Sequence, residues 1–313
     1  MENFNFQNVI GTIKNVQVYP ATQRIELNDK ATKIIFNLTP ETYRQLVEQR
    51  VKANVTEKKN HKKYGRVKSG FIISNELGYS NFAPLTEFDR AVLSVCVSNW
   101  VIGNFYVTPA MIYRGLTGKS NKGFSERYMP HSNQYAAIIQ SIDKLMFTSY
   151  DPIVLDAFEK LKYIESDETV EITKSAILPC YRIKISVNGQ VTDAIFFDRE
   201  SPLLTLANLK KQLITYDVEL LDVPNQQNTP MIITLKNYIM RRVMEIKLHK
   251  QLSPTLTFED IFKKCRIDGA KQKRNARDYI KIFLEHLVSK QVIKTFEFTK
   301  KGNAIHAVKF QPN

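Results

Sequence analysis

Ala270-Lys271-Gln272-Lys273-Arg274-Asn275-Ala276-Arg277 is a short run near the end of the chain in which half of the residues are cationic. Apolar residues follow at helical spacing, at Ile280, Phe283, Leu284, Leu287 and Val288, so the pattern predicts one amphipathic helix over residues 270–290. Two β-like runs come next, at residues 291–299 and 303–310, joined by Lys300-Lys301-Gly302. The stretch therefore predicts a helix that begins with cations and is followed by a cationic hairpin.

The charge of the chain is concentrated in the same region. Residues 230–313 hold 18 Lys and Arg against 7 Asp and Glu, a net charge of +11 out of +14 for all 313 residues. Such a balance indicates an acidic partner, either nucleic acid or an anionic membrane surface. A cationic helix followed by a cationic hairpin is what a winged helix presents to DNA, with the helix in the major groove and the hairpin on the backbone.

The remaining composition excludes several classes of protein. No apolar run approaches the roughly 20 residues that a membrane span needs, and residues 1–5 lack the layout of a signal peptide. Cys96, Cys180 and Cys265 are odd in number and far apart. This favours reduced thiols over a disulfide framework, so we expect a cytoplasmic protein without membrane contact.

Helix starts are marked by a hydroxyl residue before a proline, a pair that caps a helix and suits its first turn. The pairs are Thr39-Pro40, Thr108-Pro109, Thr229-Pro230 and Ser253-Pro254, while Thr86 with Asp89 and Thr257 with Asp260 resemble capping boxes. These signals divide the chain into an N-terminal segment and two similar halves. In the segment the pattern predicts strands at 9–18 and 33–38, a helix at 40–51 and a basic turn at 57–66.

Both halves are predicted to contain three helices and a hairpin. In the first half the pattern predicts helices at 85–99, 109–116 and 132–146 and a further helix at 202–213. It also predicts a short strand at 105–107 and a hairpin around Asn188-Gly189, with strands at 181–187 and 191–197. In the second half the helices fall at 230–249, 258–265 and 270–290. The sequence therefore predicts an α+β chain with a β-rich segment at 1–80 and tandem winged helices at 81–222 and 229–313, joined by the polar linker 223–228.

Four stretches carry a resemblance to a known family: Leu85-Thr86-x-Phe88-Asp89-x-Ala91-Val92, Thr108-Pro109-x-x-Ile112-Tyr113, Ser201-Pro202-Leu203-Leu204 and the closing unit 271–310. Their layout resembles the plasmid replication initiator (Rep) proteins, which are built from two tandem winged-helix domains. The resemblance implies sequence-specific binding of direct repeats in double-stranded origin DNA, local duplex opening and loading of host replication proteins. It also gives the first winged helix dimerisation and accessory DNA contacts. The alternative with the same fold is a winged-helix transcriptional regulator.

The start of the last helix supplies side chains that can read bases, because Arg pairs twice with guanine and Asn or Gln pairs twice with adenine. We expect DNA contacts there from Lys271, Gln272, Lys273, Arg274, Asn275, Arg277 and Lys281. We expect phosphate contacts from Lys263, Lys264 and Arg266 at and just beyond the end of the short helix, and from Lys300, Lys301 and Asn303 at the hairpin tip. Helical spacing sets Arg274, Asp278 and Lys281 opposite the apolar stripe, whereas Lys273 falls in line with it.

Each of these cations also has a simpler interpretation, either as a solvated basic face or, near a helix C-terminus, as a residue that the helix dipole favours. The corresponding helix of the first half begins His131-Ser132-Asn133-Gln134-Tyr135 and is almost uncharged. We therefore expect the first half to associate with a second copy, through strands such as 191–197, more than to read bases.

The sequence offers no catalytic constellation. The five histidines are not at metal-ligand spacing and lie far from the cysteines, and His286 is expected on a helix surface. Gly118-Lys119-Ser120 resembles the end of a phosphate-binding loop, but Tyr113 stands where that pattern needs a glycine. The expectation is a DNA-binding protein that is not an enzyme and that needs no cofactor or metal.

Overall fold

Two sets of elements repeat one another along the chain in the computed structural model, which describes residues 20–36, 71–73, 84–121, 128–150, 175–187, 190–249, 251–302 and 304–313. The first unit contains α4 (Glu87–Val101), β3 (Tyr106–Val107), α5 (Pro109–Thr117), α6 (Ser132–Phe147), β6 (Cys180–Val187) and β7 (Gln190–Phe197). The second contains α9 (Pro230–Leu248), β9 (Thr255–Thr257), α10 (Phe258–Cys265), α11 (Ala270–Ser289), β10 (Ile293–Lys301) and β11 (Ala304–Pro312).

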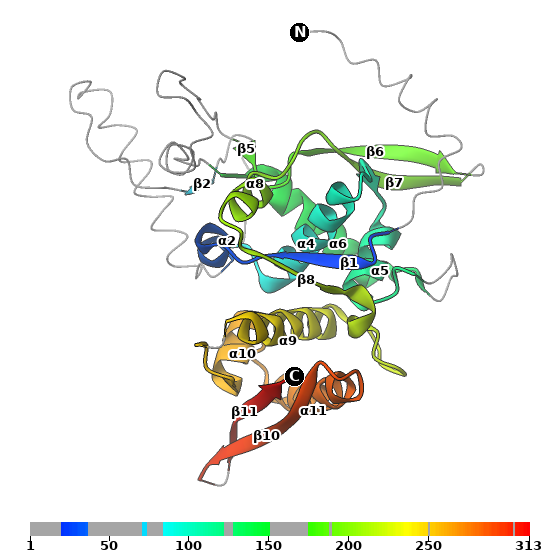
Figure 1. Cartoon of the computed structure of the whole chain (residues 1–313). Coiled ribbons are helices and arrows are strands. Elements are labelled where there is room, and N and C mark those ends of the chain that lie inside the picture. Colours follow the sequence, from blue (N-terminus) through cyan, green and yellow to red (C-terminus); the bar gives the residue numbers. More distant parts are fainter. Residues whose placement is uncertain are drawn as a thin grey trace, which may run out of the picture.

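The strands of the two units are paired in the same way. In each unit the short strand after the first helix pairs antiparallel with the last strand, which in turn pairs with the strand before it. The resulting sheet orders are β3-β7-β6 and β9-β11-β10. The chain is therefore α+β, with small sheets and two units of equal topology. The first unit lies on one side of α9, and α11 with the β10–β11 hairpin lies on the other (Figure 1).

Further elements complete the first unit. Strand β1 (Gln23–Leu27) pairs antiparallel with β8 (Leu213–Asp217), and α2 (Lys30–Ile35) follows β1. A third small sheet, of order β2-β4-β5, is formed by β2 (Phe71–Ile73), β4 (Thr148–Tyr150) and β5 (Ser175–Ala176). Helix α8 (Pro202–Leu209) precedes β8, and the 3-10 helix η3 (Val218–Leu221) leads into the linker before α9.

Threonine caps account for where four of the helices begin. The side chains of Thr86, Thr108, Thr229 and Thr257 each accept a hydrogen bond from a backbone N–H in the first turn of α4, α5, α9 and α10. At α4 the Asp89 carboxylate also accepts from the Thr86 backbone N–H, at 2.7 Å, which completes the predicted capping box. These caps satisfy N–H groups that have no partner inside the helix.

One predicted strand is wrong, one predicted helix is too long, and one predicted helix start is not followed by a helix. Residues 30–35 form a helix where the sequence predicts a strand over 33–38, because the Asp29 carboxylate caps it by accepting from the Thr32 N–H at 3.0 Å. The helix predicted over 202–213 ends at Leu209, and Lys211 then takes a φ of 52° that leads into β8. Ser253-Pro254 precedes β9 and not a helix. The strand predicted at 9–18, the helix at 40–51 and the basic turn at 57–66 lie outside the described residues.

The two hydrophobic cores meet along α9. The predicted apolar stripe of α11 is buried in the second core, at Ala276, Ile280, Phe283, Leu284 and Leu287. That core also takes Ile214 and Tyr216 from β8, which precede the predicted linker, whereas Ile233 of α9 packs in the first core. Strand β8 and helix α9 therefore join the two units more closely than a polar linker alone would.

A buried polar joint fastens the units further. The guanidinium of Arg24, fully buried, donates to the carbonyls of Ala91 and Gly115, both at 2.8 Å, and to the side-chain oxygen of Asn237 on α9, at 3.1 Å. Arg241 of α9 pairs with Glu87 of α4 at 2.8 Å and with Glu245 at 2.9 Å. Because these contacts link the first unit to α9, separating the units would expose buried charges.

Lys236 completes this joint near the linker. Its ammonium, on α9, donates to the carbonyls of Thr117 and Leu221, at 3.3 and 2.9 Å, and to Asn228 at 2.7 Å. Burial lowers the pKa of Lys236 to about 7, although Asp222 opposes the shift. The linker is thus held against the end of α5 by a buried side chain of the second unit.

Candidate nucleic-acid interface

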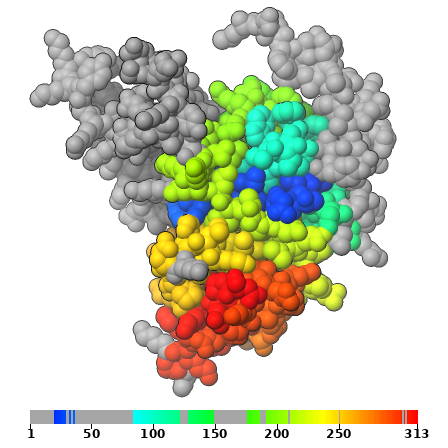
Figure 2. All heavy atoms as spheres, in the orientation of Figure 1, coloured from blue at the N-terminus to red at the C-terminus, as the bar shows by residue number. Residues whose placement is uncertain are grey.

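Helices α10 and α11 are joined by a tight turn whose conformation is fixed by local contacts. Arg266 ends α10 in the left-handed region, at a φ of 54°, and the N–H of Ile267 donates to the Phe262 carbonyl at 2.8 Å. Ile267 is buried, and α11 begins after Gly269. The turn sets α11 across α10, with the β10–β11 hairpin beside it at one end of the molecule (Figures 1 and 2).

One face of α11 is exposed along its length. Over residues 271–282 it carries three cations, an amide, a carboxylate and one partly exposed apolar residue, which are Lys271, Arg274, Asn275, Asp278, Lys281 and Ile282. One turn later, the exposed Glu285 pairs with Lys281. The opposite face is buried in the second core. Four of the seven α11 residues that the sequence predicts as DNA contacts, Lys271, Arg274, Asn275 and Lys281, are therefore brought together on one exposed surface, which we call the α11 face.

The first turn of α11 is electrostatically unusual. The helix has no side-chain cap at Gly269 and no acidic residue in its first turn, whereas Lys271, Lys273 and Arg274 all lie close to that end. The N-terminal end of a helix carries a partial positive charge, so cations there are unfavourable unless an anion binds. Free N–H groups, cations and the helix dipole together favour binding of an anion such as phosphate.

Three of the predicted contact residues are used partly within the protein. Arg277 lies over the rings of Phe258 and Phe262, at 5.4 Å from both ring centroids, and the Lys273 ammonium lies 5.9 Å from the Phe262 centroid. Both cations are half-buried. Gln272 is exposed but lines a cavity of about 260 Å³ between the units. Cation–π packing against α10 therefore holds Arg277 and Lys273 to the side of the α11 face.

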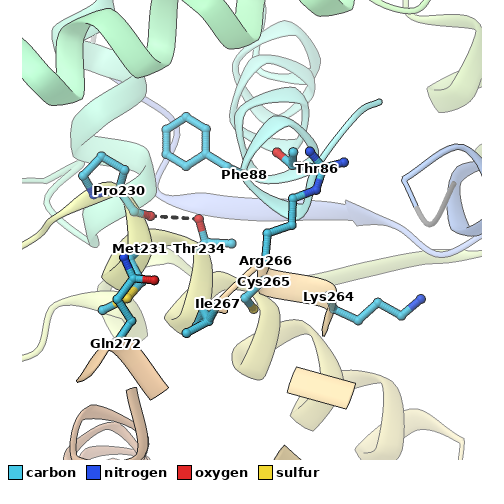
Figure 3. A pocket seen from close by; sticks show the side chains of 10 residues that line it. All are labelled: Thr86, Phe88, Pro230, Met231, Thr234, Lys264, Cys265, Arg266, Ile267 and Gln272. Atoms are coloured by element: carbon cyan, nitrogen blue, oxygen red, sulfur yellow. Dashed lines mark hydrogen bonds between the residues drawn. The ribbon is translucent and has the colours of Figure 1, made fainter. Parts of the chain in front are cut away.

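The predicted phosphate contacts at the end of α10 divide in a similar way. Lys263 is exposed. Burial lowers the pKa of Lys264, which lines the same cavity. The Arg266 guanidinium donates to the backbone carbonyl of Pro84, at 2.9 Å, and extends towards Thr86 at the start of α4 (Figure 3). Arg266 thus ties the α10–α11 turn to the first unit in this structure.

The β10–β11 hairpin has a bulge near its tip and turns at Gly302, which has a φ of 62°. Lys300 is exposed and pairs with Ile305 across the hairpin. Lys301 closes β10, although its side chain lies outside what the structure describes, as does Asn303. Lys300 therefore provides the described cation at the tip.

The third helix of the first unit differs from α11. Its exposed residues near the start are His131, Ser132, Asn133, Ala136 and Gln140. Two of its other polar side chains bond to the neighbouring hairpin: the Tyr135 hydroxyl donates to Asp193, and Asp143 pairs with Arg182 at 3.3 Å. Strand β7, predicted to pair across a two-fold axis, lies between β3 and β6, but β3 pairs only with Ile195 and Phe196. Within the described residues, β6 and the first part of β7 therefore each have one edge without a paired strand.

Residues noted for other chemistry have structural roles. Gly118 ends α5 at a φ of 86°, where a Cβ atom would lie 2.2 Å from the Asp222 backbone nitrogen, and Lys119 pairs with Asp222 at 2.7 Å. His286, predicted at the surface, is buried, and burial lowers its pKa. Among the described residues no group of three His, Cys, Asp or Glu side chains could hold a metal ion.

Sequence reasoning missed Ile282 on the α11 face and the buried joint around Arg24. Ile282 follows from the same helical spacing that placed Arg274 and Lys281. No helix within the described ranges is long and apolar enough to cross a membrane. Comparison of the chain with protein-family models, with curated proteins and with solved structures finds no match.

Proposed function

We propose that this protein is a sequence-specific, double-stranded-DNA-binding replication initiator, and that its second unit is a winged helix that makes the main DNA contact. The observation that carries the proposal is the α11 face. Its first turn places Lys271 and Arg274 at the helix end where cations are unfavourable without a bound anion. The simpler interpretation is a solvated basic face. Such a face would be more stable with its cations near the C-terminal end of the helix, where the dipole favours them.

The dimensions suit duplex DNA. An α-helix with its side chains is about 10–12 Å wide, and the major groove of B-DNA is about 12 Å wide. With α11 in the groove, Arg274 and Asn275 would meet base edges, whereas Lys271, Lys281 and the N-terminal N–H groups of α11 would meet phosphates. Lys300 at the hairpin tip and Lys263 in the last turn of α10 would meet the backbone on either side of the groove.

The first unit is proposed to support this contact and to associate with a second copy. It exposes three neighbouring apolar side chains at and after the end of α4, Val101, Ile102 and Phe105, each more than half exposed. Repulsion between the cationic second units makes the more neutral unit the better place for self-association.

The initiator role rests on the resemblance to Rep proteins, and it includes binding of direct repeats and recruitment of host replication proteins. Direct repeats suit the monomer, because a two-fold dimer matches an inverted repeat instead. A transcriptional regulator of the same fold would more often bind one inverted repeat. Footprinting of the DNA that flanks the gene separates the two. Several protected direct repeats support the initiator, and a single protected palindrome supports the regulator.

DNA binding itself is tested by a salt titration of the full chain on a labelled duplex. About four phosphate contacts, from Lys263, Lys271, Lys281 and Lys300, predict a slope of log affinity against log salt of roughly −3.6. Lys300→Ala should make the slope less steep by about 0.9. Arg199→Ala, which removes an exposed cation of the first unit, should leave it unchanged. A slope near zero for the wild type removes the proposal.

A further inference from the structure

Asp278 is an acidic residue on a surface that is otherwise suited to meet phosphates. It is exposed on the α11 face, one turn after Arg274 and one turn before Lys281 and Ile282. Lys281 pairs with Glu285, at 3.9 Å, and not with Asp278. Within the part of the chain that the structure describes, Asp278 takes part in no ion pair.

The other acids of residues 230–313 each have a structural reason for their position. Glu245 pairs with Arg241 and Arg242, Glu285 with Lys281, and Glu297 with Lys309. Asp260 belongs to the Thr257 cap, Glu259 lies in the first turn of α10, and Asp268 lies just before α11. An acid near a helix N-terminus is favoured by the dipole. Asp278 lies in the middle of α11, where the dipole contributes little. Neither an ion pair nor the helix dipole therefore accounts for its position.

A carboxylate at this position has a defined effect on DNA binding. It repels phosphates and therefore weakens binding to any sequence. In the major groove it is also repelled by guanine and thymine, whose edges present acceptors, whereas cytosine presents the N4 amino donor. Adenine presents an amino donor beside the N7 acceptor, which disfavours the second carboxylate oxygen. A carboxylate on a helix in the major groove thus weakens binding to most bases and forms a hydrogen bond with cytosine.

We propose that Asp278 is a specificity-determining residue, which accepts a hydrogen bond from the N4 amino group of a cytosine in the major groove. The inference rests on the proposed function. Arg274 lies four residues earlier, about 6 Å along the helix axis, which is close to two base steps of about 3.4 Å. Because Arg pairs with guanine, the recognised site should contain a guanine and a cytosine within about two steps of each other.

The test is selection of sites by the full-length protein from duplexes with a randomised central segment, followed by competition binding against random duplex. The wild type, Asp278→Asn and Glu285→Gln are compared. Both substitutions remove one exposed negative charge from the same helix. The amide that Asp278→Asn introduces pairs best with adenine, so this variant reports a change of preferred base as well as the loss of charge. Circular dichroism confirms that the variants fold alike.

The expected results follow from the charge and the hydrogen bond. Glu285→Gln should select the wild-type site and keep its preference over random duplex. Asp278→Asn should bind random duplex at least as well as the wild type, while its preference for the wild-type site falls about 5- to 150-fold and the selected cytosine is lost.

Three outcomes are decisive. If Asp278→Asn selects the same site with unchanged preference, as Glu285→Gln does, Asp278 is a solvated residue and the inference is wrong. A wild type that binds duplex without enriching any sequence also overturns the inference but leaves DNA binding intact. A wild type that binds no duplex removes the proposed function itself.

Discussion

The third helices of the two units occupy the same place in the same topology, yet they expose different surfaces. Helix α11 exposes Lys271, Arg274 and Lys281 at and beyond an uncapped first turn. Helix α6 exposes Ser132, Asn133 and Ala136, and its start is closed by Gln134, whose side chain accepts from the His131 N–H. The topology fixes where a third helix lies, and the side chains on its outer face decide what it can bind.

The difference extends to how each unit uses its polar groups. In the first unit Tyr135 and Asp143 bond to the adjoining hairpin, and the charges of Arg24 and Glu87 are used in the joint with α9. In the second unit Lys271 and Arg274 of the α11 face are exposed to solvent or a partner, and Lys281 pairs with the exposed Glu285. The named polar groups of the first unit are thus used in contacts within the protein, whereas the second unit exposes cations on its surface. The joint along α9 connects the two units.

The largest expected effect concerns the joint. Arg241→Ala removes the partner of buried Glu87, so the free energy of unfolding should fall by about 3–5 kcal/mol. Chemical denaturation measures it, with Arg199→Ala as the control, for which a change within about 0.5 kcal/mol is expected at an exposed position. If Arg241→Ala unfolds like the control, the two units are not held by this network.

A smaller effect concerns the loss of stability at low pH. Burial opposes the charged form of Glu245, but Arg241 and Arg242 outweigh it and lower its pKa to about 2. The unfolded pKa is about 4.3, so the stabilisation is full above that value and is lost as the pH falls towards 2, by roughly 3 kcal/mol. Unfolding followed between these pH values should show this loss in the wild type and in Glu285→Gln. Glu245→Gln should lack it, and an equal pH dependence in all three would contradict the assignment.

The comparison of the third helices is sharpened by paired substitutions. Arg274→Ala should cost about 1–3 kcal/mol at the selected DNA site if the guanidinium meets a base. Asn133→Ala, near the start of α6, should change the affinity little. Competition binding with specific and random duplex measures both. An equal loss on the two duplexes would make Arg274 a backbone contact, and a larger loss for Asn133→Ala would reverse the roles of the units.

The repeat of helices could be predicted from the sequence because its signals are local. Thr86, Thr108, Thr229 and Thr257 cap helices through contacts within three residues, and the apolar spacing of α11 determines its buried face. Strand β1 could not be predicted from local signals, because it pairs with β8, almost two hundred residues later. Helix α2 is predicted wrongly as a strand, because six residues with two adjacent isoleucines fit either pattern.

The candidate site could be predicted only in part for the same reason. Helical spacing identifies Arg274 and Lys281 as exposed, whereas the positions of Arg266, Arg277 and Lys273 depend on Pro84 and on aromatic rings of α10. The joint residues Arg24 and Lys236 have the pattern of ordinary surface cations in the sequence. Their burial depends on acceptors from distant helices, and a local pattern contains no information about those contacts.

The central claim is that α11 and not α6 enters the groove, and photo-crosslinking tests it most directly. A photoreactive amino acid replaces Asn275 of α11 or Asn133 of α6, two exposed amides on equivalent helices, in the full-length protein bound to its selected duplex. The account predicts a DNA adduct from position 275 and little or none from position 133. Adducts formed mainly from position 133, or equally from both, would contradict it.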